Sequence, residues 1–272
     1  MNFEQLTQSD SSLAFYADAP LWEGQSCGAI GQFDFKSVED GLVLIQHAVN
    51  RAKGLYALFG PMNGDTWHSY RVVSETSDRA PFPMEPISGS HDLTVLEQAG
   101  FKSISRYAST IGTLDEAIGP APITIADVSL KIWDGRGGKA LVDQIYAMSA
   151  QGFAKNKFFK PLDLDGFREI YYPLIDSLDP RFVLLAEHKS GQTCGFAFGY
   201  PADAETIVLK TYASGIRGVG HALADGFHRA ARDAGFSKII HGLMHADNIS
   251  LNHSAKHGLS VFRRYDLMAL KL

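Results

Sequence analysis

A glycine-rich stretch at residues 212–222, Tyr-Ala-Ser-Gly-Ile-Arg-Gly-Val-Gly-His-Ala, has the composition of an anion-binding turn. It follows the apolar, strand-like run 206–211 and opens the helix-like run 223–234. A strand that turns through glycines into a helix leaves several backbone N–H groups without intrahelical acceptors, at the positive end of the helix dipole. Glycines also let an anion approach the backbone closely. The stretch therefore predicts a site for a phosphate or pyrophosphate group.

Two common phosphate-binding motifs do not fit this stretch. The dinucleotide pattern G-x-G-x-x-G fails because Gly218 and Gly220 are followed by Leu223, and no acidic residue ends a second strand about twenty residues further on. The P-loop fails because the chain contains no Gly-Lys-Ser or Gly-Lys-Thr. What remains is the pattern R-x-x-G-x-A, formed by Arg217, Gly220 and Ala222.

The elements after this stretch are predicted from apolar periodicity and glycine stops. The helix that the stretch opens ends at Gly235, and a strand follows at 236–244. A helix over 247–257 ends at Gly258, and a final strand covers 260–270. The glycine stretch thus connects the first strand and the first helix in a series of strand, helix, strand, helix and strand.

The elements before the stretch complete a larger unit. The same patterns predict a strand at 123–128, helices at 138–148 and 164–178, and a hairpin of strands 182–188 and 193–200. The hairpin leads directly into the strand that precedes the glycines. These elements predict an α/β domain, and the family resemblance described next implies that its central sheet is mixed and mainly antiparallel, with helices on its faces.

This order of elements, together with R-x-x-G-x-A, resembles the acyl-CoA-binding domain of the GNAT acetyltransferase superfamily over the span 123–270. The resemblance implies that acetyl-CoA, or another acyl-CoA, is the co-substrate. Its pyrophosphate would bind the loop N–H groups, and its pantetheine arm would pair like an extra strand with the strand before the loop. The cofactor-binding residues implied in this way are Tyr212, Arg217, Gly218, Val219, Gly220, His221, Ala222 and Asn248.

The resemblance also indicates where acyl transfer would take place. The family has a tyrosine four residues before the glycine stop of the last helix, and this chain has Ser254 there. Serine donates a hydrogen bond to a thiolate but is a weak proton source, so the acid step departs from the family pattern. His245 and Asp247, at the end of the strand beside the loop strand, are candidates for the base, with Glu187 and Lys210 as rivals.

An internal repeat indicates a second, altered copy of this unit. Residues 100–107 align without gaps on residues 258–265, and the spacing of His, Arg and Gly in 47–54 recurs in 228–235. Where the second copy has Gly-Ile-Arg-Gly-Val-Gly, the first has Asp-Phe-Lys-Ser-Val-Glu, with two acidic residues and no glycine. We therefore predict that the first copy does not bind CoA.

The domains predicted from the repeat are a degenerate GNAT-like domain at 1–115 and an acyl-CoA-binding GNAT domain at 116–272. An irregular linker is expected over 112–122, which contains two glycines and two prolines. Further predicted elements of the first domain are strands at 12–17, 26–35, 55–59, 67–73 and 102–110 and helices at 37–53 and 92–99.

Composition limits the classes of partner. The formal net charge of −5 argues against a broad nucleic-acid surface. No export signal stands at the start and no long apolar run occurs, so neither membrane association nor export is expected. Cys27 and Cys194 make no disulfide framework, which favours a cytoplasmic protein. No metal is expected, because the histidine pairs at 241/245 and 253/257 lack further ligands.

The sequence as a whole predicts an N-acetyltransferase that passes an acetyl or other acyl group from acyl-CoA to a primary amine. The acceptor is a small-molecule amine or a protein amine, and the sequence leaves a homodimer open. A non-catalytic CoA-responsive or protein-interaction module is the alternative, suggested by Ser254 in the tyrosine position. A nucleotide-binding module is a third reading, which the two failed phosphate motifs disfavour.

Overall fold

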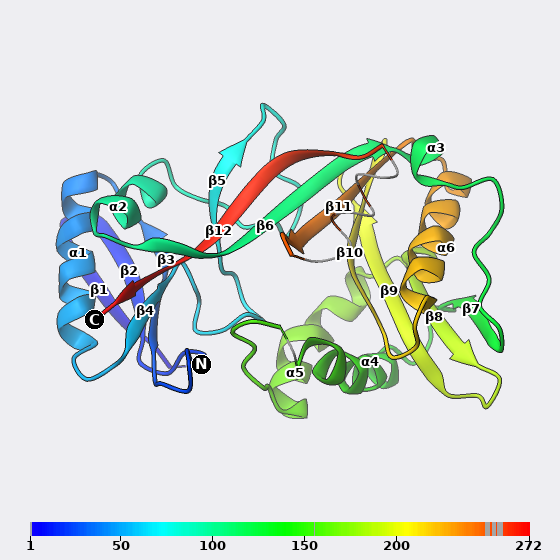
Figure 1. The fold of residues 1–272 in the computed structure, drawn as a ribbon, viewed down its shortest axis with the longest axis horizontal. Helices are drawn as coiled ribbons and strands as arrows, with labels where there is room; N and C mark the ends of the chain where they lie inside the picture. The colour runs from blue at the N-terminus through cyan, green and yellow to red at the C-terminus, as the bar shows by residue number, and fades with distance from the viewer. Residues whose placement is uncertain (1, 155, 248–250, 252–253, 255–257) are drawn as a thin grey trace. The chain divides into compact units, whose positions relative to one another are not determined.

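The computed structural model of the protein describes residues 2–154, 156–247, 251, 254 and 258–272. The chain forms two compact units. The first consists of Met1–Ala108, Asn156–Lys160 and Arg263–Leu272, and the second of Ser109–Lys155 and Pro161–Phe262. The fold is mixed α/β, with mainly antiparallel sheet flanked by helices (Figure 1). The predicted fold class is confirmed.

The first unit places its strands in the order β1-β2-β3-β4-β12-β6, with β5 paired to β12. Helices α1 and α2 pack on this sheet around an apolar core that includes Leu44, Leu58 and Phe101. The elements are β1 (Glu4–Gln8), β2 (Ser11–Tyr16), β3 (Gly28–Asp34), α1 (Val38–Arg51), β4 (Ala57–Gly60), β5 (Val72–Thr76), α2 (Asp92–Gln98), β6 (Lys102–Thr113) and β12 (Ser260–Lys271).

The second unit places its strands in the order β6-β11-β10-β9-β8-β7. Its core includes Phe182, Leu223 and Phe227. Its elements, besides the end of β6, are α3 (Leu114–Ala117), β7 (Val128–Ile132), α4 (Gly138–Phe153), α5 (Leu164–Tyr171), two 3₁₀ turns (Tyr172–Ser177 and Pro180–Phe182), β8 (Val183–His188), β9 (Thr193–Pro201), β10 (Thr206–Ser214), α6 (Val219–Asp233) and β11 (Lys238–His245).

The helices α6 and α4 cover opposite faces of the second sheet. Gly195 of β9 lies opposite Ser214 of β10 and faces Leu223 of α6, which would be 3.0 Å from a Cβ at that glycine. The residue before Ser214, Ala213, faces Gly152 of α4. Because successive strand residues point to opposite faces, the strand before the glycine stretch is covered on both sides. Only its edge and its end remain for a ligand.

The last strands of the two sequence copies are exchanged. Strand β12, from the second copy, pairs antiparallel with β4 of the first unit, from Met268 opposite Gly60 to Lys271 opposite Ala57. Strand β6, from the first copy, lies beside β11 in the second unit, where Ser109 Oγ accepts the Leu243 N–H at 3.0 Å. Each unit therefore completes its sheet with a strand from the other copy.

The repeated unit itself is the same in both copies. In each copy, a helix connects two parallel, paired strands. These elements are β3, α1 and β4 in the first copy, and β10, α6 and β11 in the second. Each helix ends at a glycine in the left-handed region, Gly54 at φ +90° and Gly235 at φ +95°. The expected duplication of structure is present in these elements.

Several predicted elements differ from the structure. The expected irregular linker begins instead with the end of β6 and with α3, because Thr113 and Glu116 form a capping box that starts a helix. The strand predicted at 67–73 is displaced to β5, because the Asp65 carboxylate accepts the N–H groups of Trp67 and His68 and makes a turn there. The domain boundary at 115/116 stays a prediction.

We expect the first unit to depend on the far end of the chain. Removing residues 263–272 takes away the partner of β4 and the core side chain Met268. In the shortened protein, the β4 amides should lose most of their protection from hydrogen exchange, whereas those of β9 should keep theirs. A peptide of residues 260–272 added in trans should restore the protection. Unchanged protection of β4 would contradict the exchanged pairing.

Candidate functional site

The two parallel strands of the second unit part halfway along their length. Their pairing runs from Thr206 opposite Lys238 to Leu209 opposite His241 and ends there. Beyond Leu209 the register with β9 is irregular, and from there to Ser214 strand β10 is paired only with β9. The end of β10 therefore has a neighbouring strand on one side, while β11 runs on separately to its own end (Figure 1).

The backbone of Tyr212 is directed toward the side from which β11 has departed. The Gly215 N–H donates to the Cys194 carbonyl of β9 at 3.1 Å. Since backbone groups alternate along a strand, the N–H and C=O of Ala213 point the same way, and those of Tyr212 and Ser214 point away from β9. An extended ligand lying along this edge would meet the backbone of Tyr212.

The glycine stretch makes a tight turn from β10 into α6. Ser214 Oγ accepts the Ile216 N–H and donates to its carbonyl, both at 3.0 Å, which fixes the start of the turn. Gly218 is the N-cap of α6 and adopts φ +87°, a conformation that costs little only for glycine. It carries no side chain that would cap the helix, so the first turn of α6 is left to another acceptor.

The N–H groups at this helix start fall into two sets. Val219 donates to the Ile216 carbonyl at 3.2 Å, and His221 and Ala222 donate to the Gly218 carbonyl at 3.0 and 3.2 Å. Within the described part of the chain, the N–H groups of Gly218 and Gly220 have no acceptor, and neither has that of Arg217. These three donors, at the positive end of α6, are suited to an anion.

The predicted set of loop donors is thus rearranged. Gly218 and Gly220 offer their N–H groups, Val219, His221 and Ala222 use theirs inside the turn, and Arg217 adds one. The ring of Tyr212 lies over Gly220, and a Cβ there would be 3.3 Å from the ring edge. A larger residue at this position would press on the Tyr212 ring.

The corresponding place in the first unit is occupied by the chain itself. Beyond the pairing of β3 with β4, the Met62 N–H donates to the Ile30 carbonyl at 2.7 Å, and Asn63 Oδ1 accepts the Gln32 N–H at 3.0 Å. A Cβ at Gly31 would lie 2.2 Å from that same Asn63 oxygen. The segment after β4 therefore fills the edge that β11 leaves beside β10.

The helix start in the first unit has a side-chain cap, which the start of α6 lacks. Ser37 Oγ accepts the Asp40 N–H at 3.1 Å and caps α1, and Glu39 and Asp40 lie in the first turn. Two carboxylates at this position repel an anion. That the first copy does not bind CoA stays a prediction.

Ser254, the residue at the family's tyrosine position, is buried and contacts a histidine that the sequence did not single out for catalysis. Its Oγ lies 2.6 Å from His241 Nδ1, and it also donates to Met244 Sδ at 3.5 Å. His241 is the last residue of β11 that pairs with β10. Regular alternation would place His241 and Met244 on opposite faces of β11, so the sequence does not reveal that Ser254 contacts both.

His245 and Asp247 lie together at the end of β11. His245 Nδ1 accepts the Asp247 N–H at 3.1 Å, and the Asp247 carboxylate is 3.8 Å from the same nitrogen. A neutral ring that accepts at Nδ1 carries its proton on Nε2. In this arrangement the ring is a hydrogen-bond donor at Nε2, and the exposed Asp247 carboxylate is the more accessible base.

Other candidate groups are engaged or lie elsewhere. The Glu187 carboxylate accepts from Lys131 Nζ at 2.7 Å, and burial raises the pKa of the Cys194 thiol, which donates to the Ala186 carbonyl. Asn248 lies outside the described residues. Among the residues that are described, no group of three His, Cys, Asp or Glu is arranged to hold a metal ion, and no helix is long and apolar enough to cross a membrane.

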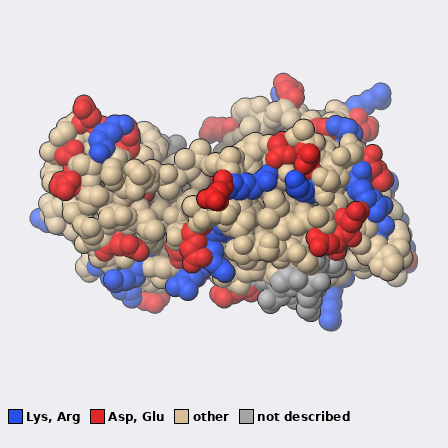
Figure 2. Space-filling model, turned by 90° about the horizontal axis from the view of Figure 1, so that it is seen from above, with Lys and Arg blue, Asp and Glu red and all other residues tan. Residues whose placement is uncertain are grey.

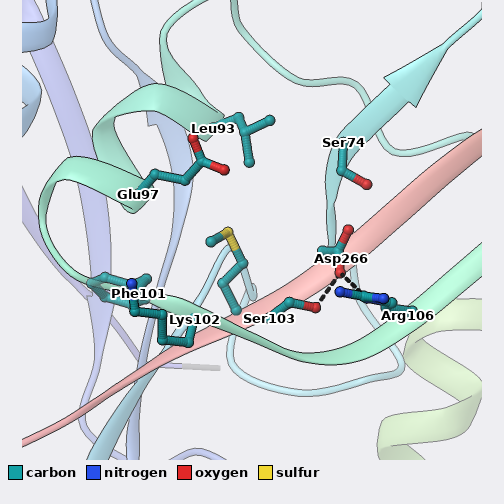
Figure 3. Close-up of a pocket in the computed structure, with 9 residues that line it drawn as sticks. Ser74, Leu93, Glu97, Phe101, Lys102, Ser103, Arg106 and Asp266 are labelled. Atoms are coloured by element: carbon teal, nitrogen blue, oxygen red, sulfur yellow. Dashed lines mark hydrogen bonds and ion pairs between the residues drawn. The ribbon is translucent and has the colours of Figure 1, made fainter.

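The described surface of the first unit has a hollow, and charges of both signs are mixed on the surface. A hollow of about 340 Å³ in the first unit is lined by Ser74, Leu93, Glu97, Phe101, Lys102, Ser103, Arg106, Asp266 and Met268 (Figure 3). Its Asp266 carboxylate accepts from Ser103 and lies 3.6 Å from Arg106 Nε, so these charges already have partners. Acidic and basic side chains are interspersed on the face seen in Figure 2.

The architecture is the fold of the GNAT N-acetyltransferases, present in tandem. A GCN5-related N-acetyltransferase from Sphaerobacter thermophilus superposes with a TM-score of 0.59 at 15% identity, over 96% of this chain and 76% of that one. A tandem GNAT protein from the clavulanic acid biosynthesis pathway gives 0.56 at 14% identity, over 96% and 78%.

A GCN5-related N-acetyltransferase from Kribbella flavida gives a TM-score of 0.54 at 10% identity, over 96% of this chain and 57% of that one. No protein-family model matches the sequence, and no curated protein matches it. The likeness therefore lies in the fold, and the chemistry must be argued from the residues of the chain itself.

The left-handed N-cap can be tested against its neighbour in the same turn. Gly218→Ala should lower the free energy of unfolding by about 1–2 kcal/mol, because an L-residue is strained at that φ, and because a Cβ would be 3.0 Å from Ile125. Gly215→Ala, where a Cβ meets nothing within 4 Å, should change it by less than about 0.5 kcal/mol. Chemical denaturation measures both, and equal losses would contradict the assigned turn.

Proposed function

We propose that the second unit binds acetyl-CoA, or another acyl-CoA, and transfers the acyl group to a primary amine. The observation that carries the proposal is the set of acceptor-free N–H groups of Arg217, Gly218 and Gly220 at the start of α6. They stand at the end of a strand that has parted from its parallel neighbour. The tandem GNAT fold supports the same activity.

The residues at the helix start suit the pyrophosphate of CoA. The N–H groups of Gly218 and Gly220 would each donate to a phosphate oxygen, and the exposed guanidinium of Arg217 would add a positive charge. A Cβ at Gly215 would meet nothing within 4 Å, so an oxygen can approach the turn from that side. The pantetheine arm would follow β10 past Tyr212 toward Leu209.

The acyl-CoA supplies an activated acyl group, and the chain must handle two protons. An attacking amine is nucleophilic only when neutral, so a base must remove a proton from its nitrogen. The Asp247 carboxylate at the end of β11, oriented beside His245, is proposed to accept it directly or through water. The departing sulfur needs a proton as well, and Ser254 is the hydroxyl proposed to face it.

The acceptor is proposed to be a small-molecule amine or a protein amine. The alternative, a CoA-responsive module without turnover, shares the binding site and differs only in chemistry. An amine panel assayed for thiol release after CoA binding is established separates these two. Thiol release that depends on amine concentration identifies the enzyme.

We expect one CoA site per chain. Isothermal titration with acetyl-CoA should give a stoichiometry of one, because Met62 and Asn63 fill the edge in the first unit and Glu39 and Asp40 repel an anion at its helix start. ATP titrated in parallel should not bind, since the turn lacks a P-loop lysine. A stoichiometry of two would overturn the assignment of the first unit, and ATP binding alone would indicate a nucleotide module.

An acidic side chain at Gly220 should abolish CoA binding. In Gly220→Asp, a carboxylate would repel the pyrophosphate at the helix start, and the new Cβ would press on the Tyr212 ring. Calorimetry should show a loss of at least about 100-fold in affinity, which corresponds to two charge-assisted hydrogen bonds.

Two matched variants separate charge from bulk. Gly220→Asn has nearly the same shape without the charge, and Gly220→Ala adds the Cβ alone. Affinity should fall in the order Gly, Ala, Asn, Asp, with the largest step between Asn and Asp. If all four proteins bind acetyl-CoA equally, the loop is not the site.

A further inference from the structure

The second unit contains a line of three hydrogen-bonded polar side chains from three separate segments. Ser254 Oγ is 2.6 Å from His241 Nδ1, and His241 Nε2 is 2.9 Å from His228 Nε2. Ser254 is 1% exposed and His228 4% exposed, while His241 of β11 is partly buried between them. His228 lies on the buried face of α6, next to Phe227.

The geometry of the two imidazoles determines how protons are placed. The ring planes differ by 9° and the ring centres are 5.1 Å apart, whereas the Nε2 atoms are 2.9 Å apart. The rings therefore meet edge to edge, nitrogen toward nitrogen. Two lone pairs cannot face each other at this distance, so one Nε2 carries a proton and the other accepts it. The contact is therefore a hydrogen bond between the two rings.

The hydroxyl of Ser254 has a choice of acceptor. It contacts His241 Nδ1 and, at 3.5 Å, the sulfur of Met244. When its single proton points at a sulfur, the short contact with Nδ1 requires Nδ1 to be the donor. The three side chains can then pass a proton in one direction, from His228 through His241 to the serine oxygen.

The position of His241 connects this line with the proposed substrate. His241 is the last β11 residue paired with β10, so it marks the point where the strands part. A pantetheine arm that starts at the turn after Ser214 and runs back to Leu209 covers five residues, about 16 Å of strand. Its sulfur would arrive at this point.

A purely structural role explains these observations less well. A buried line of imidazoles and a hydroxyl costs desolvation, and apolar side chains of the same shape would fill the space at no such cost. In the described part of the chain, His228 is the only histidine among the buried residues of α6. A functional use of the line accounts for that cost.

We propose that Ser254, His241 and His228 form a proton relay that protonates the leaving thiolate. This proposal rests on the proposed acyltransferase function. As the carbon–sulfur bond of the tetrahedral adduct breaks, its electron pair stays on sulfur, which takes the proton of Ser254 Oγ. The serine oxygen takes the proton of His241 Nδ1, and His241 Nε2 takes one from His228 Nε2.

The protons balance over a turnover. His228 starts as the imidazolium and ends as the neutral ring, and the pair regains one proton from solvent. The amine nitrogen releases one proton to solvent, so amine and thioester become amide and thiol. An imidazolium is a stronger acid than a thiol, and burial strengthens that acid because it disfavours the charged ring, so the net transfer is downhill. The Ser254 hydroxyl passes the proton on, and His228 supplies it.

Turnover by variants is the first test. Ser254→Ala, His241→Gln and His228→Gln should each lower kcat by about 100-fold, the usual effect of losing a general acid. The KM for acetyl-CoA and the calorimetric CoA affinity should stay within about twofold. The double variant of Ser254 and His241 should be no slower than either single variant, because one pathway is cut twice. Ser254→Thr, which keeps the hydroxyl, should retain most of the turnover.

The chain contains a matched control. On the β8–β9 hairpin, His188 Nδ1 lies 2.9 Å from Ser190 Oγ, the same pair of groups outside the relay. His188→Gln should leave kcat unchanged. Additive losses at Ser254 and His241, or a loss that appears only in CoA affinity, would overturn the relay in favour of a structural role.

A second measurement needs neither turnover nor a variant of His228. With the histidines labelled with ¹⁵N, adding CoA to the full chain should shift the His241 and His228 ring signals, because the thiol contacts Ser254. Desulfo-CoA, which lacks the sulfur, should bind without shifting them, and Ser254→Ala should bind CoA without the shift. CoA binding that leaves both rings unchanged overturns the relay while the acyltransferase proposal stands. Absence of CoA binding overturns the proposed function and the relay with it.

Discussion

The parting of β10 and β11 after Leu209 and His241 is the constraint on which the rest of the second unit depends. A fully paired sheet offers no backbone to a ligand, because its N–H and C=O groups are already used. Here the longer strand keeps its neighbour β9 on one side only, and the change in register after Leu209 turns its end into the loop. The helix dipole and the glycines then meet at the end of β10.

The two copies show how little is needed to remove such a site. Both have a parallel strand pair around a helix, but β4 is four residues long where β11 has eight. The chain after β4 turns back, and Met62 and Asn63 bond to the edge of β3. Two acids in the first turn of α1 complete the difference. The same topology is thus an anion site in one copy and a closed structural element in the other.

Local patterns in the sequence were sufficient to predict the repeated unit and the glycine turn. The helix stops at Gly54 and Gly235, the β8–β9 hairpin and the unfavourable charge at Glu39 all follow from residues close together in the chain. The sequence does not predict helix α3, although Thr113 and Glu116 have capping-box spacing. The glycines and prolines around these residues predict an irregular linker instead.

Pairing between distant segments could not be predicted in the same way. The strands β6 and β12 follow similar sequences, so nothing local decides which of them lies beside β4 and which beside β11. The Ser254–His241 contact has the same origin. Each residue could be placed on its element, and His228 could be placed on a buried helical face, but the distance between them depends on strand register and helix docking, which are tertiary properties.

The exchanged strands also set an order in time. During synthesis at about 5–20 residues per second, the first unit waits roughly seven to thirty seconds between completion of β6 and arrival of β12. Through that interval the edge of β4 and the pocket for Met268 lack their native partners. A chain that stops before β12 leaves this unit incomplete. The ribosome must therefore synthesise β12 before the sheet of the first unit can complete its pairing. The first unit is therefore the first to be synthesised but among the last to complete its sheet. The two copies of the repeat fold as one cooperative unit.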